Sequence, residues 1–284
     1  MGWLEKLIGV LDLIKVENSI FVLPFTYIGM LFAPGLTFSK FVLVTVALVS
    51  ARGAAFAANR YIGRVYDIKN PSKKKWSSVS LYSKGEILLI FLGLSAVFLV
   101  SAYMLNIFAF IFAPLILVLV ILEPYTKQYT GHRHFSMALI IGLGILGGYI
   151  GVAGAFPPFP ALYVLLLGYM FFSASNDIII SASHMEFDLR SGLKTYATRY
   201  GVKGALRYSY YAHGIAVVLF ALFGYLSASW IIAAGAVATY PVLLLEHKNL
   251  ERDAGAKNLN RSFFYYNAAV SLIMLASVLI FKFA

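Results

Sequence analysis

The chain has 284 residues, of which 61% are hydrophobic, 16% aromatic and only 12% charged, and its mean hydropathy is +0.81. A soluble domain carries about 25% charged residues, so this composition excludes the ordinary globular classes and indicates a polytopic membrane protein. The formal net charge of +11 would favour a nucleic-acid partner in a soluble protein, but in a membrane protein it is expected in the loops of one face, and no nucleic-acid partner is predicted. The absence of cysteine excludes disulfides, thiolate catalysis and cysteine-ligated metal centres.

The hydropathy pattern predicts an all-α protein. Residues 1–15 are expected to form an amphipathic helix at the membrane interface, because Trp3, Leu7 and Leu11 lie opposite its charged residues. A helix that spans a bilayer needs about 20 mostly apolar residues. Nine stretches approach this length, at about 17–34, 40–60, 86–105, 107–122, 136–155, 161–183, 205–226, 228–245 and 263–283. We therefore expect one transmembrane domain, residues 1–284, with nine transmembrane helices.

The basic residues predict the orientation. All of them except Lys40, Arg52 and Lys282 lie in the N-terminal helix or at connections that follow even-numbered spans. By the positive-inside rule, an integral protein of the cell or inner membrane is expected, with a cytoplasmic N-terminus and a C-terminus outside. Segments 61–85 and 184–204 are expected to form the loops of a cytoplasmic cap.

A first polar constellation ends the second span. Arg52, Asn59 and Gly63 are spaced by seven and four residues, so that together with Asp67 they fall on one helical face. An arginine inside a span costs roughly 3 kcal/mol or more unless it is paired or hydrated, so Arg52 is expected to face a polar cavity. The alanines and glycines before Asn59 also suit close helix packing, a role that needs no ligand.

A second constellation ends the sixth span. Asp177, Ser181, His184 and Asp188 recur at spacings of four, three and four, which predicts one shared helical face. A helix end emerging into water explains Asp188, but Asp177 lies about two turns deeper.

These residue types favour a particular ligand. Asparagine and aspartate provide the hard oxygen atoms that suit Mg²⁺, which completes its coordination with water and phosphate. Nearby basic side chains are suited to phosphate, namely Arg60, Arg64, Lys127 and Lys194. The residues therefore predict a cytoplasm-facing site for a metal-chelated diphosphate with an apolar tail.

At these residues the chain resembles the UbiA superfamily of intramembrane prenyltransferases, most closely members that act on aromatic quinone precursors. The family's first motif, Asn-x-x-x-Asp-x-x-x-Asp, aligns with Asn59 to Asp67, and Asp67-Ile68-Lys69-Asn70-Pro71 continues the match. Its second motif aligns with Asp177, Asp188 and Gly192-Leu193-Lys194. Other similar segments are Glu17 to Phe25, Pro124 to Lys127, and Phe263-Phe264 with Asn267.

The resemblance implies a central lipid-facing cavity under the cap, Mg²⁺ as cofactor, and transfer of a prenyl group from a prenyl diphosphate to an aromatic acceptor. It implies metal binding by Asn59, Asp67 and Asp188, and a catalytic role for Asp177 as a metal ligand or as the residue that orients the acceptor. The implied diphosphate-binding residues are Arg52, Arg60, Arg64, Lys127 and Lys194. His184 is interpreted as a catalytic base, as a hydrogen-bond donor to phosphate when it is protonated, or as an ordinary polar residue of a helix end.

Two departures from the family pattern leave an alternative open. Gly63 and His184 stand where the family has aspartates; glycine has no side-chain ligand, and imidazole is a poor ligand for Mg²⁺. These losses weaken a two-metal site, although a one-metal site built on Asn59, Asp67, Asp177 and Asp188 remains compatible. The alternative is a non-catalytic quinone- or lipid-binding subunit with partner membrane subunits. A transporter is a third interpretation, disfavoured because almost no charge lies on the outer half.

Overall fold

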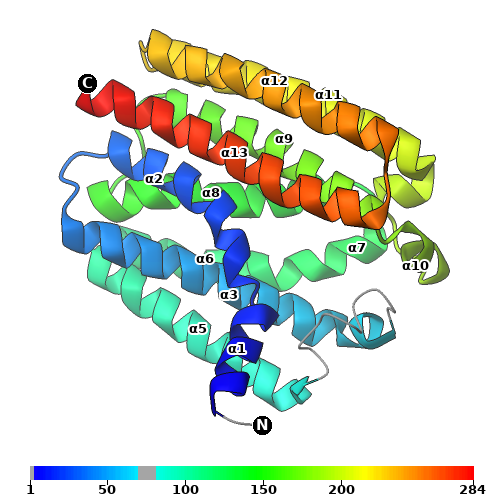
Figure 1. Ribbon diagram of the computed structural model, residues 1–284. Helices are drawn as coiled ribbons and strands as arrows, with labels where there is room; N and C mark the ends of the chain where they lie inside the picture. Colours follow the sequence, from blue (N-terminus) through cyan, green and yellow to red (C-terminus); the bar gives the residue numbers. More distant parts are fainter. Residues whose placement is uncertain (1–2, 70–80) are drawn as a thin grey trace. The chain divides into compact units, whose positions relative to one another are not determined.

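The computed structural model describes residues 3–69 and 81–284, and the regular structure in this part of the chain is entirely helical (Figure 1). Eight of the described helices are long and apolar enough to cross a membrane, which confirms an all-helical integral membrane protein. In chain order, the elements are α1 (Trp3–Leu13), η1 (Val16–Phe21), α2 (Leu23–Phe32), α3 (Phe38–Lys69), α5 (Lys84–Leu105), α6 (Ile107–Leu122), η3 (Glu123–Tyr125), α7 (Thr126–Tyr129), α8 (Arg133–Ala153), α9 (Ala161–Ala182), α10 (Met185–Arg190), α11 (Tyr196–Leu226), α12 (Trp230–Arg252) and α13 (Ala256–Phe283).

The first of the nine expected spans, 17–34, differs from the prediction. It is divided into the 3₁₀ segment η1 and the short helix α2, which has Pro24 in its first turn, where proline's missing amide proton costs no helical hydrogen bond. Together η1 and α2 run from Val16 to Phe32, at the lower end of the about 17 to 25 residues that a span needs, so the segment remains compatible with nine membrane helices but is broken at Val22. Several side chains of α2 are buried in protein, and Phe25 and Ile28 are fully covered.

The chain divides into two compact units. The first comprises Met1–Ser19 and Thr37–Thr126. Within it, α3, α5 and α6 pack against one another, and α1 contacts α3. The Tyr82 hydroxyl donates a hydrogen bond to the carbonyl oxygen of Lys6 at 2.6 Å, which ties α1 to the segment just before α5. Leu13, Ile14 and Ile87 bury their side chains beside this contact.

The second unit comprises Ile20–Leu36 and Lys127–Ala284. Its helices form a closed circuit of packed neighbours in the order α2, α8, α9, α11, α12 and α13, with α13 packed again on α2 and also on α9 (Figure 1). Fully buried rings of Phe25, Phe172 and Phe220 lie between 5.5 and 6.1 Å apart in its interior. Because α9 contacts α8, α11 and α13, the side chains at its end are held by several helices.

Helices α2 and α8 approach each other closely through glycine. A Cβ atom added at Gly148 would overlap the Thr26 carbonyl oxygen and would lie 3.2 Å from Met30 Cγ. Gly29 makes the reciprocal contact, since a Cβ there would overlap the carbonyl oxygen of Ile145. Small residues at such crossings let two backbones pack directly, so these glycines set the separation between α2 and α8.

Candidate functional site

The end of α3 carries the first group of predicted residues. Because α3 is continuous from Phe38 to Lys69, Arg52, Asn59 and Gly63 share one helix, as their spacing predicts. The Arg52 guanidinium lies 5.6 Å from the centre of the Phe56 ring, in a cation–π contact, and the side chain is half-buried. Arg60 and Arg64 are also half-buried on this helix. The backbone of Asp67 belongs to α3, whereas its side chain lies outside the described part of the structure.

Gly63, the position of the missing family aspartate, has room for a side chain. A Cβ atom added there would meet Asn59 Oδ1 at 3.7 Å, an ordinary van der Waals distance, and no other heavy atom within 4 Å among the described residues. Crowding on α3 therefore does not account for the glycine.

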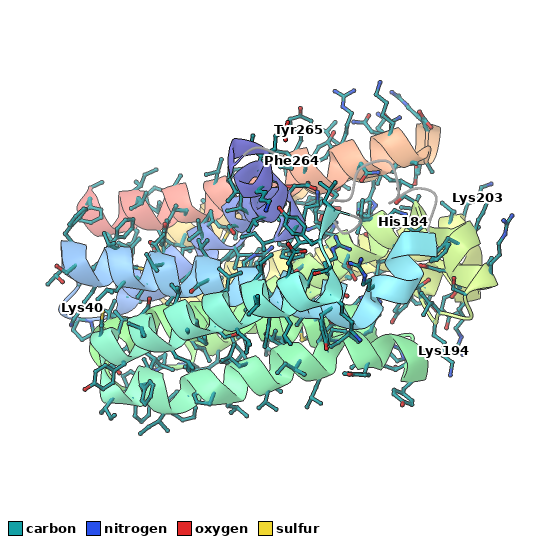
Figure 2. The ribbon with its side chains drawn as sticks, turned by 90° about the horizontal axis from the view of Figure 1, so that it is seen from below. Lys40, His184, Lys194, Lys203, Phe264 and Tyr265 are labelled. Carbon is teal, nitrogen blue, oxygen red and sulfur yellow. The ribbon has the colours of Figure 1, made fainter. Side chains whose placement is uncertain are left out.

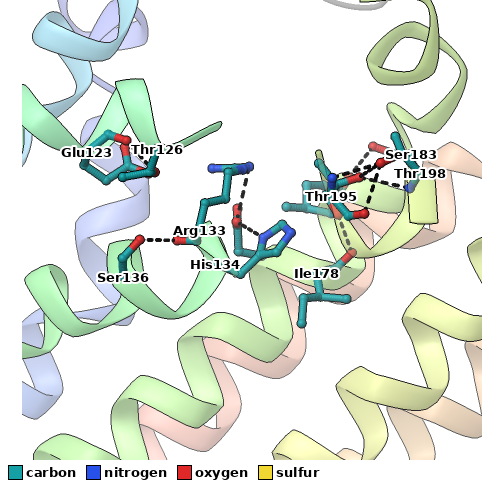
Figure 3. Close-up of polar contacts among 12 residues, drawn as sticks. Glu123, Thr126, Arg133, His134, Ser136, Ile178, Ser183, Thr195 and Thr198 are labelled. Carbon is teal, nitrogen blue, oxygen red and sulfur yellow. Dashed lines mark hydrogen bonds and ion pairs between the residues drawn. The ribbon is translucent and has the colours of Figure 1, made fainter. Parts of the chain in front are cut away.

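Asp177 lies on α9 and is held by two residues of α8. An Arg133 Nη2 atom is 3.4 Å from Asp177 Oδ2, and Nδ1 of His134 makes a short hydrogen bond with the same oxygen (Figure 3). A carboxylate within a spanning helix needs such partners because isolated charge is costly in the membrane. The depth of Asp177 in the sequence pattern signalled that a partner was required, but sequence reasoning did not identify His134, which is fully buried.

The predicted continuous face from Asp177 to Asp188 is wrong, because α9 ends at Ala182. The hydroxyls of Ser181 and Ser183 donate to carbonyl oxygens three residues earlier, at 2.8 and 2.7 Å, and close the last turn. His184 follows as the N-cap of α10, and Asp188 lies inside that separate helix; both side chains are half-buried.

The segment after α10 turns sharply. Gly192 has φ of 67°, in the left-handed region that favours glycine. Lys194 follows and is exposed; His184, Lys194 and Lys203 lie at one end of the second unit (Figure 2). Thr195 caps α11 with a reciprocal hydrogen-bond pair to Thr198. The side chain of Lys127, on α7, lies outside the described part of the structure.

Aromatic side chains lie beside His134, the hydrogen-bond partner of Asp177. The Tyr196 ring centre is 5.8 Å from that of His134, 6.5 Å from Phe135 and 5.0 Å from Tyr208. The Tyr196 hydroxyl also shares a 2.9 Å hydrogen bond with Nδ1 of His132. The faces of such rings can stabilise positive charge.

Each of the two units contains a side chain with an oxygen atom that suits Mg²⁺. In the first unit, Asn59 offers an amide oxygen on α3 beside a glycine that offers no side-chain donor. In the second, Asp188 offers a carboxylate, whereas the imidazole of His184 is a poor ligand for this ion. A protein typically supplies only a few oxygen ligands to Mg²⁺, because this ion keeps coordination positions for water and phosphate.

Comparisons with known proteins identify similar sequences and folds. A sequence model described as the UbiA prenyltransferase family matches residues 22–268. A 4-hydroxybenzoate octaprenyltransferase from Polynucleobacter necessarius subsp. necessarius (strain STIR1) is 28% identical over 209 residues, which are 70% of this chain and 71% of that protein. A protein of the same name from Azoarcus sp. (strain BH72) is 27% identical over 161 residues, 56% of this chain and only 55% of that protein.

Solved structures share the fold. The apo structure of a UbiA homolog from Aeropyrum pernix K1 has a TM-score of 0.81 and 25% sequence identity, covering 93% of this chain and 98% of that one. A UbiA homolog from Archaeoglobus fulgidus bound to DMAPP and Mg²⁺ has a TM-score of 0.73 at 18% identity, covering 96% of this chain and 99% of that one. The second likeness concerns the fold alone.

Proposed function

Because the chain belongs to the UbiA prenyltransferase family, we propose that it transfers a prenyl group from a prenyl diphosphate to an aromatic quinone precursor within the membrane. The observation that carries the proposal is the pairing of Asp177, at the position of the second family motif, with Arg133 and His134 beside an aromatic surface. The names of the relatives support an aromatic acceptor of the hydroxybenzoate class.

In this reaction the bond between the allylic carbon and the diphosphate oxygen breaks, and the electron pair leaves with the diphosphate. The allylic carbon then forms a bond to a ring carbon of the acceptor, and the ring proton is lost to a base. Stabilising charge on the departing group is usually the largest catalytic contribution. We assign this work to basic side chains that bind the diphosphate, namely Arg52, Arg60, Arg64, Lys127 and Lys194.

We assign Mg²⁺ binding to Asn59, Asp67 and Asp188. When bound, this ion would neutralise negative charge that develops on the diphosphate. Arg133 and His134 fix the orientation of the Asp177 carboxylate, which then orients the acceptor. Tyr196 and its neighbouring rings stabilise the positive charge of the allylic cation. We assign His184, when it is protonated, as a hydrogen-bond donor to a phosphate oxygen.

The assay uses purified protein with Mg²⁺, a panel of prenyl diphosphates and a panel of hydroxylated aromatic acids, and measures diphosphate release and prenylated product. Asp188→Asn should lower turnover by about 100-fold or more, because it removes a ligand of the metal–diphosphate complex. Glu186→Gln is the matched control, since Glu186 is exposed on the same short helix, and it should retain the wild-type rate. Equal rates in the two variants would contradict the role of Asp188.

The replacements at Gly63 and His184 favour one competing function, a non-catalytic quinone- or lipid-binding subunit. The Gly63→Asp, His184→Asp double variant tests it, because a Cβ atom at position 63 meets Asn59 Oδ1 at an ordinary van der Waals distance of 3.7 Å. Under the catalytic proposal the wild type turns over, and the double variant is equal or faster. No turnover by the wild type with restored turnover in the double variant would establish the competing function.

We also propose that the N-terminus is cytoplasmic and the C-terminus outside, so that the diphosphate enters from the cytoplasm. The chain has no cysteine, so a single introduced cysteine reports its own side of the membrane. A membrane-impermeant thiol reagent should label Trp230→Cys, at the exposed start of α12, in intact cells. Lys203→Cys, near the start of α11, should be labelled only after permeabilisation, and the reverse pattern would invert the orientation.

A further inference from the structure

Three potential metal-binding side chains meet inside the second unit, and none of them is assigned a role in prenyl transfer. His213 lies on α11, and Glu246 and His247 lie on α12. Each offers a ligand atom within 4.8 Å of the other two, and this is the one such group identified among the described residues. The three side chains are almost completely covered, with exposed fractions of 2%, 0% and 6%.

The distances between the ligand atoms suit a shared cation. Nδ1 of His213 is 2.9 Å from Nε2 of His247 and 3.7 Å from Oε2 of Glu246. In a tetrahedral zinc site with bonds of about 2.0 to 2.1 Å, neighbouring ligand atoms lie about 3.3 Å apart. The two observed distances bracket this value, so an ion requires only small side-chain adjustments.

The two oxygens of Glu246 have different surroundings. Oε1 accepts a 2.6 Å hydrogen bond from the Ser262 hydroxyl of α13. Oε2 is buried, faces His213, and has no hydrogen-bond partner in the described part of the chain. A buried carboxylate oxygen without a donor is costly, and a cation would supply the missing interaction. Ser262 then acts as a positioning residue that holds the carboxylate toward the histidines, as outer hydrogen bonds commonly do in metal sites.

A cavity adjoins this cluster. It has a volume of about 120 Å³, and its lining includes both histidines together with Tyr210, Tyr240, Gly214 and Leu243. A water molecule occupies about 30 Å³ of liquid, so a water or a small ligand fits beside the histidines. Three protein ligands with an open fourth position are typical of catalytic zinc sites, whereas structural sites have four protein ligands.

We propose that His213, Glu246 and His247 bind one divalent transition-metal ion of the zinc class, with its fourth coordination position open to this cavity. Two imidazoles and one carboxylate suit zinc and its transition-metal neighbours, whereas Mg²⁺ prefers oxygen ligands throughout. The site is therefore chemically distinct from the Mg²⁺ site assigned to prenyl transfer, and it does not depend on that function.

The first experiment measures metal content. Chelator-treated protein in detergent is incubated with Zn²⁺ in the presence of excess Mg²⁺, which occupies all-oxygen sites, and is then desalted and analysed for zinc. The wild type should retain one equivalent, and Glu246→Gln should weaken zinc binding by about 100-fold or more. This variant keeps an oxygen that accepts from Ser262 and removes a charge from a spanning helix, so it should fold.

The matched control is His132→Gln, an exposed histidine outside the cluster, which should retain the zinc. Zn²⁺ should also raise the apparent unfolding temperature of the wild type and of His132→Gln, but not that of Glu246→Gln. No retained zinc in the wild type, or equal zinc in the wild type and Glu246→Gln, would overturn the proposal and leave the three residues as a hydrogen-bonded polar cluster.

A second experiment tests the open coordination position. Co²⁺ bound to the wild type should give visible absorption bands that shift when azide is added. Gly214→Leu should bind Co²⁺ but lose the azide response, because a Cβ at Gly214 meets no atom within 4 Å and the larger side chain would occupy the cavity. Wild-type bands that do not respond to azide would overturn the open position.

Discussion

The crossing of α2 and α8 provides a matched pair of glycine substitutions. In Gly148→Ala the new methyl group overlaps the Thr26 carbonyl oxygen, a backbone atom that has no rotamer through which to move away. In Gly147→Ala, one position earlier on α8, the methyl group meets no atom within 4 Å. The same chemical change is therefore made twice on one helix, once against a packed backbone and once in open space.

The structure also sets the expected magnitudes. Overpacking costs about 1 to 3 kcal/mol, and relief at Gly148 requires α2 to move outward and disturb the ring of Phe25 against Phe172, so we expect the upper end. Alanine is better than glycine in a helix by about 1 kcal/mol, which benefits both variants. Gly148→Ala should therefore be about 3 kcal/mol less stable than Gly147→Ala.

The assay is the apparent unfolding temperature of each purified variant in one detergent, together with the half-life at a fixed elevated temperature, because membrane proteins often unfold irreversibly. A difference of about 3 kcal/mol corresponds to a gap of about 5 to 10 °C in a chain of this size. Gly147→Ala should match or exceed the wild type. Equal shifts in the two variants, or a larger loss in Gly147→Ala, would refute close α2–α8 packing as the cause.

Three further outcomes are expected. Ser175→Ala should cost about 1 kcal/mol of stability, because its hydroxyl bonds Ser209 of α11 at 2.6 Å, whereas Ser181→Ala loses a bond within its own helix and should cost less in the same unfolding assay. Burial, reinforced by the charge of Glu86, raises the pKa of Tyr82, so the contact between Tyr82 and α1 should persist at neutral pH and weaken as pH rises above about 10; Tyr82→Phe should show faster proteolysis of α1 than the wild type at neutral pH, and the difference should shrink above about pH 10. Arg133→Gln should lower prenyl-transfer turnover by about 10- to 100-fold by releasing Asp177, and Arg133→Lys should recover part of the loss; unchanged turnover in the first variant would contradict the positioning role.

Hydropathy was sufficient to predict the helical membrane architecture, because spans are long and apolar almost wherever they occur. It did not predict the break at Val22 within 17–34, where the 3₁₀ segment η1 is followed by the ten-residue helix α2. Spacing placed Asn59 and Gly63 correctly on α3, but it failed between Asp177 and Asp188, because serine hydroxyls close α9 before that face continues.

The sequence did not allow us to predict which residues of other helices contact the polar side chains. The depth of Asp177 showed that it needed a counter-charge, yet Arg133 and His134 come from α8, and only the packing of α8 on α9 brings them to it. Neither His213 nor Glu246 was singled out from the sequence. Their proximity depends on how α11 packs on α12, which no local pattern encodes.

The break between α9 and α10 separates two kinds of structural constraint. Residues of α9 are fixed by packing on three helices, so substitutions there alter the architecture of the whole unit. His184 instead caps a six-residue helix that has no fully buried side chain. Histidine or aspartate at position 184 therefore places no demand on the packing of α9, so this exchange requires no compensating change in the helices around Asp177.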